Sequence, residues 1–169
     1  MSNKSTSFNE IRNIKVNNKV LDFSTPKIMG VLNLTPDSFY DGGMNKNRDI
    51  WLSRTEGMLK SGADIIDIGA VSTRPGAKEI SVDEELRRII EPLKLLTNTF
   101  PKAIFSIDTY RSQVAKETVD AGANIINDIS GGTMDSDMFK TIADLKVPYI
   151  LMQIHGTPQT MMNSPIDAN

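Results

Sequence analysis

Polar side chains stand at the ends of several short apolar runs in this sequence. Five of them follow or close runs rich in isoleucine, leucine and valine: Asn33, Asp67, Asp108, Asn127 and Gln153. In parallel sheets the carboxyl ends of successive strands meet at one edge, and ligands bind there. Amide and carboxylate oxygens suit both hydrogen-bond donors on a ligand and hard cations. The sequence therefore predicts one binding site built from strand ends.

Two polar loops accompany these strand ends. Residues 35–43 read TPDSFYDGG and place two carboxylates, hydroxyl groups and aromatic rings beside a glycine pair. Residues 70–80 contain the run STRP. A surface turn is the alternative, but a loop that only connects two elements has no need of so many reactive groups. We interpret both as ligand-handling loops that close over the site.

The elements that would position these groups alternate along the chain. Apolar runs predict strands at 28–32, 65–68, 103–107, 124–126 and 148–152. Helical patterns are expected at 48–61, 81–98, 111–121 and 135–145. An amino-terminal β-hairpin over 11–23, turning at Asn17-Asn18, is expected to cover one end of the core. Ser81 and Glu84 predict a capping box, and Pro92 is expected to kink or split the helix that follows.

Repeated strand–helix units with continuous apolar strands predict the α/β class with a parallel sheet. The run 62–67 is echoed by the run 122–127, which supports a repeated unit. An open doubly wound sheet would usually show a glycine-rich turn after its first strand, and none is seen here. A TIM-type (βα)8 barrel is therefore the favoured fold.

Residues 28–43, IMGVLNLTPDSFYDGG, resemble the first signature of dihydropteroate synthases, N-x-T-x-D-S-F-x-D-G. Residues 62–75 resemble the second, G-A-D-I-I-D-I-G followed by S-T-R-P. The resemblance spans roughly residues 27–161. Enzymes of this family join 6-hydroxymethyl-7,8-dihydropterin pyrophosphate to p-aminobenzoate in folate biosynthesis and release pyrophosphate with Mg²⁺ present.

The resemblance implies roles for the strand-end residues. It makes Asn33 the Mg²⁺ contact, and Asp108 and Asn127 the pair that reads the pterin edge. It also places Met152 against the pterin. Asn33 would otherwise cap a turn, Asp108 and Asn127 would cap helices, and Met152 would pack in the core. The resemblance does not settle whether Asp67 faces the ligand or braces the barrel.

The resemblance also assigns the loop residues. Thr73 would touch the pyrophosphate-bearing substrate, while Arg74 and Pro75 would enclose p-aminobenzoate. Asp41 would pair with Arg74 and steady a pterin cation, which makes these two the catalytic candidates, and Phe39 would wall the amine pocket. A surface salt bridge is the alternative for Asp41 with Arg74. His155 is expected to have no catalytic function.

Composition limits the other function classes. The net charge of −2 argues against nucleic acid or membrane surfaces as main partners. No run is long and apolar enough to cross a membrane, and the first ten residues do not form a secretory signal. Zero cysteines fit a cytoplasmic protein. Residues 1–10 are expected to be disordered, and 11–169 to form one partial pterin-binding barrel domain.

The number of predicted elements is smaller than a whole barrel requires. A complete (βα)8 barrel takes roughly 250 residues, whereas about five strands and four helices are expected here. We therefore expect a truncated barrel with two open sheet edges, inactive as a synthase by itself. A homodimer is possible for the full-length enzyme.

Two other functions stay open at this point. A pterin-binding methyltransferase module would share the barrel, but the loops at 35–41 and 72–75 argue against it. The second alternative is a non-catalytic barrel fragment. The second loop has no obvious insertion, which resembles sulfonamide-sensitive enzymes.

Overall fold

The computed structural model describes residues 12–16, 19–34, 43–71 and 79–152 of the chain. Its elements in chain order are β1 (Asn13–Val16), β2 (Lys19–Asp22), β3 (Met29–Asn33), α1 (Gly43–Lys60), β4 (Ile65–Gly69), α2 (Val82–Thr99), β5 (Phe105–Asp108), α3 (Ser112–Asp120), β6 (Ile125–Asp128), α4 (Met138–Leu145) and β7 (Tyr149–Leu151). Within these ranges no helix is long and apolar enough to cross a membrane.

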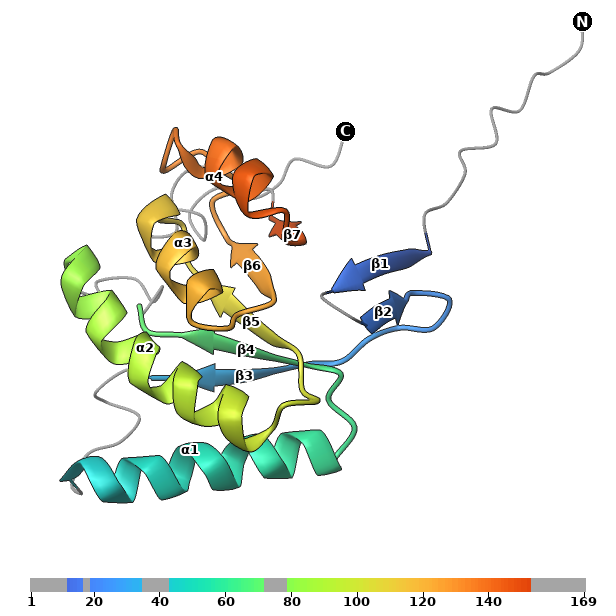
Figure 1. Ribbon diagram of the computed structural model, residues 1–169, viewed down its shortest axis with the longest axis vertical. Coiled ribbons are helices and arrows are strands. Elements are labelled where there is room, and N and C mark those ends of the chain that lie inside the picture. Colours follow the sequence, from blue (N-terminus) through green and yellow to red (C-terminus); the bar gives the residue numbers. More distant parts are fainter. Residues whose placement is uncertain (1–11, 17–18, 35–42, 72–78, 153–169) are drawn as a thin grey trace, which may run out of the picture.

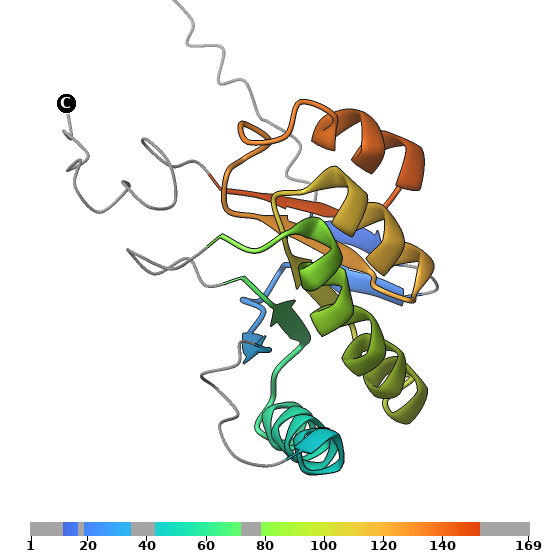
Figure 2. The same ribbon diagram turned by 90° about the vertical axis from the view of Figure 1, so that its left-hand side faces the viewer.

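Strands β3 to β7 form one parallel sheet whose spatial order follows the chain order. Figures 1 and 2 show helices α1 to α4 on one face of this sheet. A doubly wound sheet would reverse its strand order and cover both faces. The arrangement is that of a truncated α/β barrel, as the sequence predicted.

Alternation along the strands separates two apolar clusters. The larger one lies between sheet and helices, where Ile66, Ile68 and Phe105 pack against side chains such as Leu93 and Val114. The smaller one lies on the other sheet face and contains Ile65, Ile104 and Ile125 at the amino ends of strands. Period-two strands buried on both sides account for both clusters.

The antiparallel pair of β1 and β2 closes the amino ends of the barrel strands (Figure 1). Val16 and Leu21 of this hairpin complete the smaller apolar cluster. The hairpin prediction is confirmed, while its turn at 17–18 lies outside the described residues. With the amino ends covered by the hairpin, the carboxyl ends of the strands are the end at which a barrel of this type binds its ligands.

Helix α2 corrects one prediction. It runs without a break from Val82 to Thr99 with Pro92 inside it, so the expected split is wrong, while the alternative, a kink at Pro92, stays a prediction. A proline in a helix interior costs about 3 kcal/mol because it lacks an N–H donor. Here Pro92 is itself buried together with Ile89 and Leu93, and this packing outweighs that cost. One of the two hydrogen bonds of the predicted capping box is confirmed: Glu84 N donates to Ser81 Oγ over 3.2 Å.

The sheet has two edge strands in the part of the chain described. Val31 on β3 and Leu151 on β7 are 59% and 52% exposed. Parallel edge strands with exposed apolar side chains are surfaces on which further strands pair. The expectation of two open edges is therefore confirmed for the described residues.

Asp128 at the end of β6 stabilises the turn that follows it. Its carboxylate is fully buried and accepts hydrogen bonds from Ser130 N at 2.7 Å and Gly132 N at 2.9 Å. Tyr149 on β7 donates its hydroxyl to the same carboxylate over 2.6 Å. Asp128 thus belongs to the helix-facing side, opposite to its neighbour Asn127.

Replacing Tyr149 with phenylalanine is expected to lower the free energy of unfolding by about 1.5 kcal/mol, the effect of one hydrogen bond to a charged group. Urea denaturation would measure the loss. Tyr110→Phe is the matched control, because its hydroxyl lies 3.5 Å from Glu79 and makes at most a weak bond. An equal loss in both variants would contradict the role assigned to Asp128.

Candidate active site

Four residues from neighbouring strands align in one row across the carboxyl end of the sheet. The register pairs Asn33 with Gly69, Gly69 with Asp108, and Asp108 with Asn127. Residues paired in parallel strands project from the same face. Because Ile65 and Ile125 lie four and two residues before members of this row, it projects from the face opposite the helices. We call Asn33, Gly69, Asp108 and Asn127 the polar row.

Gly69 leaves an open space between two oxygen-bearing side chains of the polar row. A Cβ atom at this position would lie 3.3 Å from Asp108 Oδ2 and 3.6 Å from Asn33 Oδ1. The amide oxygen and the carboxylate oxygen therefore border one small volume. Any side chain at Gly69 would enter that volume.

Asp108 is the one titratable member of the polar row, and its pKa is strongly shifted. Burial, followed by the negative charges of Asp67, Glu85 and Asp128, raises the pKa of Asp108 to about 7. A carboxyl group that changes charge near neutral pH at a strand end is typical of a functional site. Helix capping does not explain it, because the residue that precedes α3 is Arg111.

Asn127 is held by a carboxylate that the sequence left without a role. Its Nδ2 donates to Asp67 Oδ2 over 3.0 Å, although 60 residues separate the two. Asp67 is 4% exposed. This buried carboxylate therefore supports the polar row through its hydrogen bond to Asn127. Helix capping does not apply to Asn127 either, since Asp137 precedes α4.

The remaining predicted residues fall into two groups. Met152 follows β7, is 43% exposed, and donates its backbone N–H to the Asp128 carbonyl, so ordinary core packing does not describe it. The other predicted residues lie outside the described part of the chain: Phe39, Asp41, Thr73, Arg74, Pro75, Gln153 and His155. Their positions relative to the polar row stay predictions.

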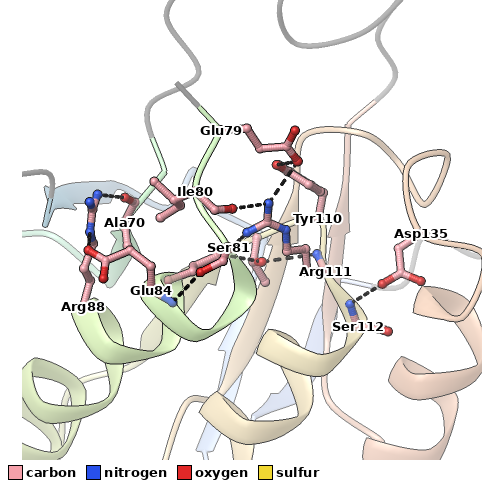
Figure 3. A network of polar contacts seen from close by, with 12 residues as sticks. Ala70, Glu79, Ile80, Ser81, Glu84, Arg88, Tyr110, Arg111, Ser112 and Asp135 are labelled. Carbon is pink, nitrogen blue, oxygen red and sulfur yellow. Dashed lines mark hydrogen bonds and ion pairs between the residues drawn. The ribbon is translucent and has the colours of Figure 1, made fainter. Parts of the chain in front are cut away.

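A polar network at the second loop was missed by the sequence reasoning (Figure 3). Arg111 donates to Glu85 Oε2 over 2.6 Å and to the Ile80 carbonyl over 2.7 Å. Thr109 donates to Glu85 Oε1 over 2.7 Å, and Arg88 donates to the Ala70 carbonyl over 3.2 Å. Two arginines therefore hold the described residues on either side of the segment 72–78.

Glu85 is the buried centre of this network. Its side chain is inaccessible to solvent, and burial raises its pKa, although Thr109 and Arg111 offset part of that effect. The sequence did contain a signal. Glu85 occupies the same helical stripe as Ile89 and Leu93, where a charge is expected only with a partner.

The polar row fits a divalent cation of the Mg²⁺ type as a partial ligand set. No group of three or more acidic or histidine side chains suited to a metal occurs in the ranges the structure describes. Mg²⁺ commonly keeps several waters and takes one or two protein oxygens together with substrate phosphates. Exposed Asn33, with its amide oxygen beside the space over Gly69, suits that role.

Comparison with known proteins gives one consistent match. The family model described as "Pterin binding enzyme" matches residues 29–169. A folate synthesis bifunctional protein of Arabidopsis thaliana is 46% identical over 155 residues, which cover 90% of this chain and 32% of that protein.

Two solved structures resemble the fold closely. Dihydropteroate synthase of Yersinia pestis in complex with a sulfonamide drug superposes with a TM-score of 0.81 at 39% identity, over 93% of this chain and 56% of that one. The Xanthomonas albilineans dihydropteroate synthase with 4-aminobenzoic acid gives 0.78 at 35% identity, over 86% and 54%. The chain thus spans about half the length of these enzymes.

Proposed function

The chain belongs to the family of pterin-binding enzymes, and we propose that it provides the pterin half of a dihydropteroate synthase site. The reaction would join 6-hydroxymethyl-7,8-dihydropterin pyrophosphate to p-aminobenzoate and release pyrophosphate. The observation that carries the proposal is the polar row, in which Asn33, Asp108 and Asn127 share one level at the carboxyl ends of adjacent strands.

Within this proposal Asp108 and Asn127 bind the pterin. The edge of a pterin presents amino and ring N–H donors, and a carboxylate beside an amide oxygen accepts them in parallel. Leaving such buried donors unpaired would cost about 1–3 kcal/mol each. Because Asp108 and Asn127 are partly buried, they favour a heterocycle whose edge carries several N–H donors. Met152, two residues beyond Ile150 on the adjacent strand, would contact the ring.

Asn33 would hold Mg²⁺ at the pyrophosphate end of the substrate. Mg²⁺, when bound, supplies positive charge that offsets the charge of the departing pyrophosphate. The amide oxygen contributes to this without adding negative charge. Gly69 keeps the space between Asn33 and Asp108 open for the substrate.

The loop residues keep the roles that the family resemblance implies. Asp41 and Arg74 are proposed as catalytic, Thr73 as a contact of the pyrophosphate-bearing substrate, and Phe39 and Pro75 as walls of the p-aminobenzoate pocket. The sulfonamide and 4-aminobenzoic acid named with the two solved relatives support a pocket for p-aminobenzoate-like molecules in this family. A cytoplasmic location fits the absence of cysteine from the sequence.

Calorimetry of the chain tests the proposal with two separate probes, 6-hydroxymethylpterin and Mg²⁺-pyrophosphate. Both are expected to bind. Asn127→Ala should weaken the binding of 6-hydroxymethylpterin and leave the binding of Mg²⁺-pyrophosphate unchanged. Asn33→Ala should weaken the binding of Mg²⁺-pyrophosphate and leave that of the pterin unchanged. Binding of the pterin without pyrophosphate would favour a methyltransferase-type module, and binding of neither would indicate a non-catalytic fragment.

A glycine substitution tests the space between the two subsites. Gly69→Ala is expected to weaken the binding of both probes by roughly threefold to tenfold. Its methyl group would displace the Asp108 oxygen by a few tenths of an ångström and would fill the space beside the Asn33 oxygen. Isothermal titration would measure both affinities. Gly57→Ala is the matched control, since this exposed helical position has no atom within 4 Å of a Cβ. Equal binding by both variants would show that the space is not used.

A further inference from the structure

Asp67 is a buried carboxylate that the proposed reaction does not use. It lies in the middle of β4, two residues before Gly69, and is 4% exposed. Among the described residues, neither its Oδ1 nor the buried Ser106 Oγ beside it on the adjacent strand makes a hydrogen bond of good geometry. Burial raises the pKa of Asp67, and the side chains of Ser106 and Asn127 offset part of that rise. Such a group lowers stability relative to an apolar side chain of similar size.

The hydrogen bond that Asp67 does make has a defined direction, with Asn127 as the donor and Asp67 as the acceptor. Asn127 Nδ2 is 3.0 Å from Asp67 Oδ2. An ionised carboxylate only accepts hydrogen bonds, so the NH₂ end of the Asn127 amide must face it. The amide oxygen and nitrogen point in different directions from the same trigonal carbon, so Oδ1 is directed away from Asp67 when Nδ2 faces it.

We infer that Asp67 is a positioning residue that fixes the amide of Asn127 with its oxygen toward the ligand. The inference rests on the proposed function for the identity of the ligand, a heterocycle edge with N–H donors. With the opposite amide orientation, Asn127 would present its own N–H donors to the N–H donors of the ligand, and no hydrogen bond could form between them. By fixing the orientation of the Asn127 amide, Asp67 makes this subsite specific for ligands that donate hydrogen bonds.

The first experiment observes the amide itself in the ligand-free chain. Nitrogen-15 NMR should show one Asn127 side-chain N–H protected from solvent exchange and shifted downfield by its bond to a carboxylate. The signal is assigned by its absence in Asn127→Asp. Asp67→Leu should remove the protection, because it leaves Asn127 Nδ2 without an acceptor. An Asn127 amide that exchanges freely in the wild-type chain overturns the inference, whatever the pterin does.

The second experiment uses a charge-conserving exchange and 6-hydroxymethylpterin as probe. Asp67→Asn alone is expected to weaken binding by up to about tenfold, because an amide at position 67 can both donate and accept and no longer fixes which end of the Asn127 amide faces it. In the double variant Asp67→Asn/Asn127→Asp, the new amide donates to the new carboxylate, whose second oxygen still accepts from the ligand. Binding should return to within about threefold of wild type. Such rescue is not expected if Asp67 only supports the core.

Ser106→Ala is the matched control, because Ser106 is buried beside Asp67 and has no bond to Asn127. It should leave affinity unchanged, and thermal melts should confirm that every variant is folded. Wild-type binding that Asp67→Asn leaves unaltered would overturn the positioning role and leave the proposed function intact. A protected Asn127 amide in a chain that binds no pterin would refute the proposed function while supporting the orientation.

Discussion

Replacing Glu85 with alanine is expected to lower the free energy of unfolding by about 3–5 kcal/mol, the range found when one partner of a buried ion pair is removed. Glu85 is inaccessible to solvent and accepts from Arg111 over 2.6 Å and from Thr109 over 2.7 Å. Without it, a guanidinium that is only 12% exposed loses its shortest contact. Urea denaturation at neutral pH would measure the change.

The neighbouring glutamate is the control for this prediction. Glu84 precedes Glu85 on α2 and pairs with Arg87 and Arg88 nearer the surface. Ion pairs in such positions contribute little, so Glu84→Ala should change stability by far less. Similar losses from the two substitutions would contradict a special role for Glu85.

A double variant separates the ion pair from the space it fills. Glu85→Leu combined with Arg111→Met replaces two opposite charges with apolar side chains of similar size. Such replacements of buried pairs are often neutral, so most of the loss in Glu85→Ala should be regained. The Ile80 carbonyl would still lose its donor and the buried Thr109 hydroxyl its acceptor, and a residual loss is therefore expected.

The fold was largely predictable because its signals are local. Apolar runs, helix caps and strand–helix alternation place the elements, and the parallel topology follows from their order. Two features were not local. Helix α1 begins at Gly43, five residues before the predicted start, since 43–47 contains no apolar periodicity. Pro92 does not split α2, because the packing around it decides the outcome.

The site was predictable to the level of strand ends and no further. Asn33, Asp108 and Asn127 were identified because each ends an apolar run, and the register brings them to one level. The register also shows why Gly69 stands between two of them. The contact of Asp67 with Asn127 joins residues 60 positions apart, and no sequence periodicity encodes it.

Asp108 should make pterin binding depend on pH in the neutral range. Burial and the charge of Asp67 are the two largest causes that raise its pKa to about 7. The ionised carboxylate accepts a ligand N–H more strongly than the protonated acid, whose O–H would also face the donors of the ligand, so affinity should fall as the pH drops below 7, by at most about tenfold per pH unit. Calorimetry with 6-hydroxymethylpterin between pH 5 and 7.5, in metal-free buffer, would measure this. Buffers of different ionisation enthalpy should also show proton release on binding.

The same pKa shift predicts the opposite trend for stability. A carboxyl group whose pKa is raised in the folded state favours folding while it is protonated, and this contribution is lost as pH rises through about 7. Asp108→Asn should therefore be more stable than the wild-type chain at pH 8, by on the order of 2 kcal/mol after allowance for water at a partly buried site. At pH 4 the difference in stability between the two chains should nearly vanish.

The pterin affinity of Asp108→Asn should be weak and independent of pH between pH 5 and 7.5. A wild-type chain whose affinity stays constant from pH 5 to 7.5 would show that the ionised carboxylate of Asp108 does not contribute to pterin binding.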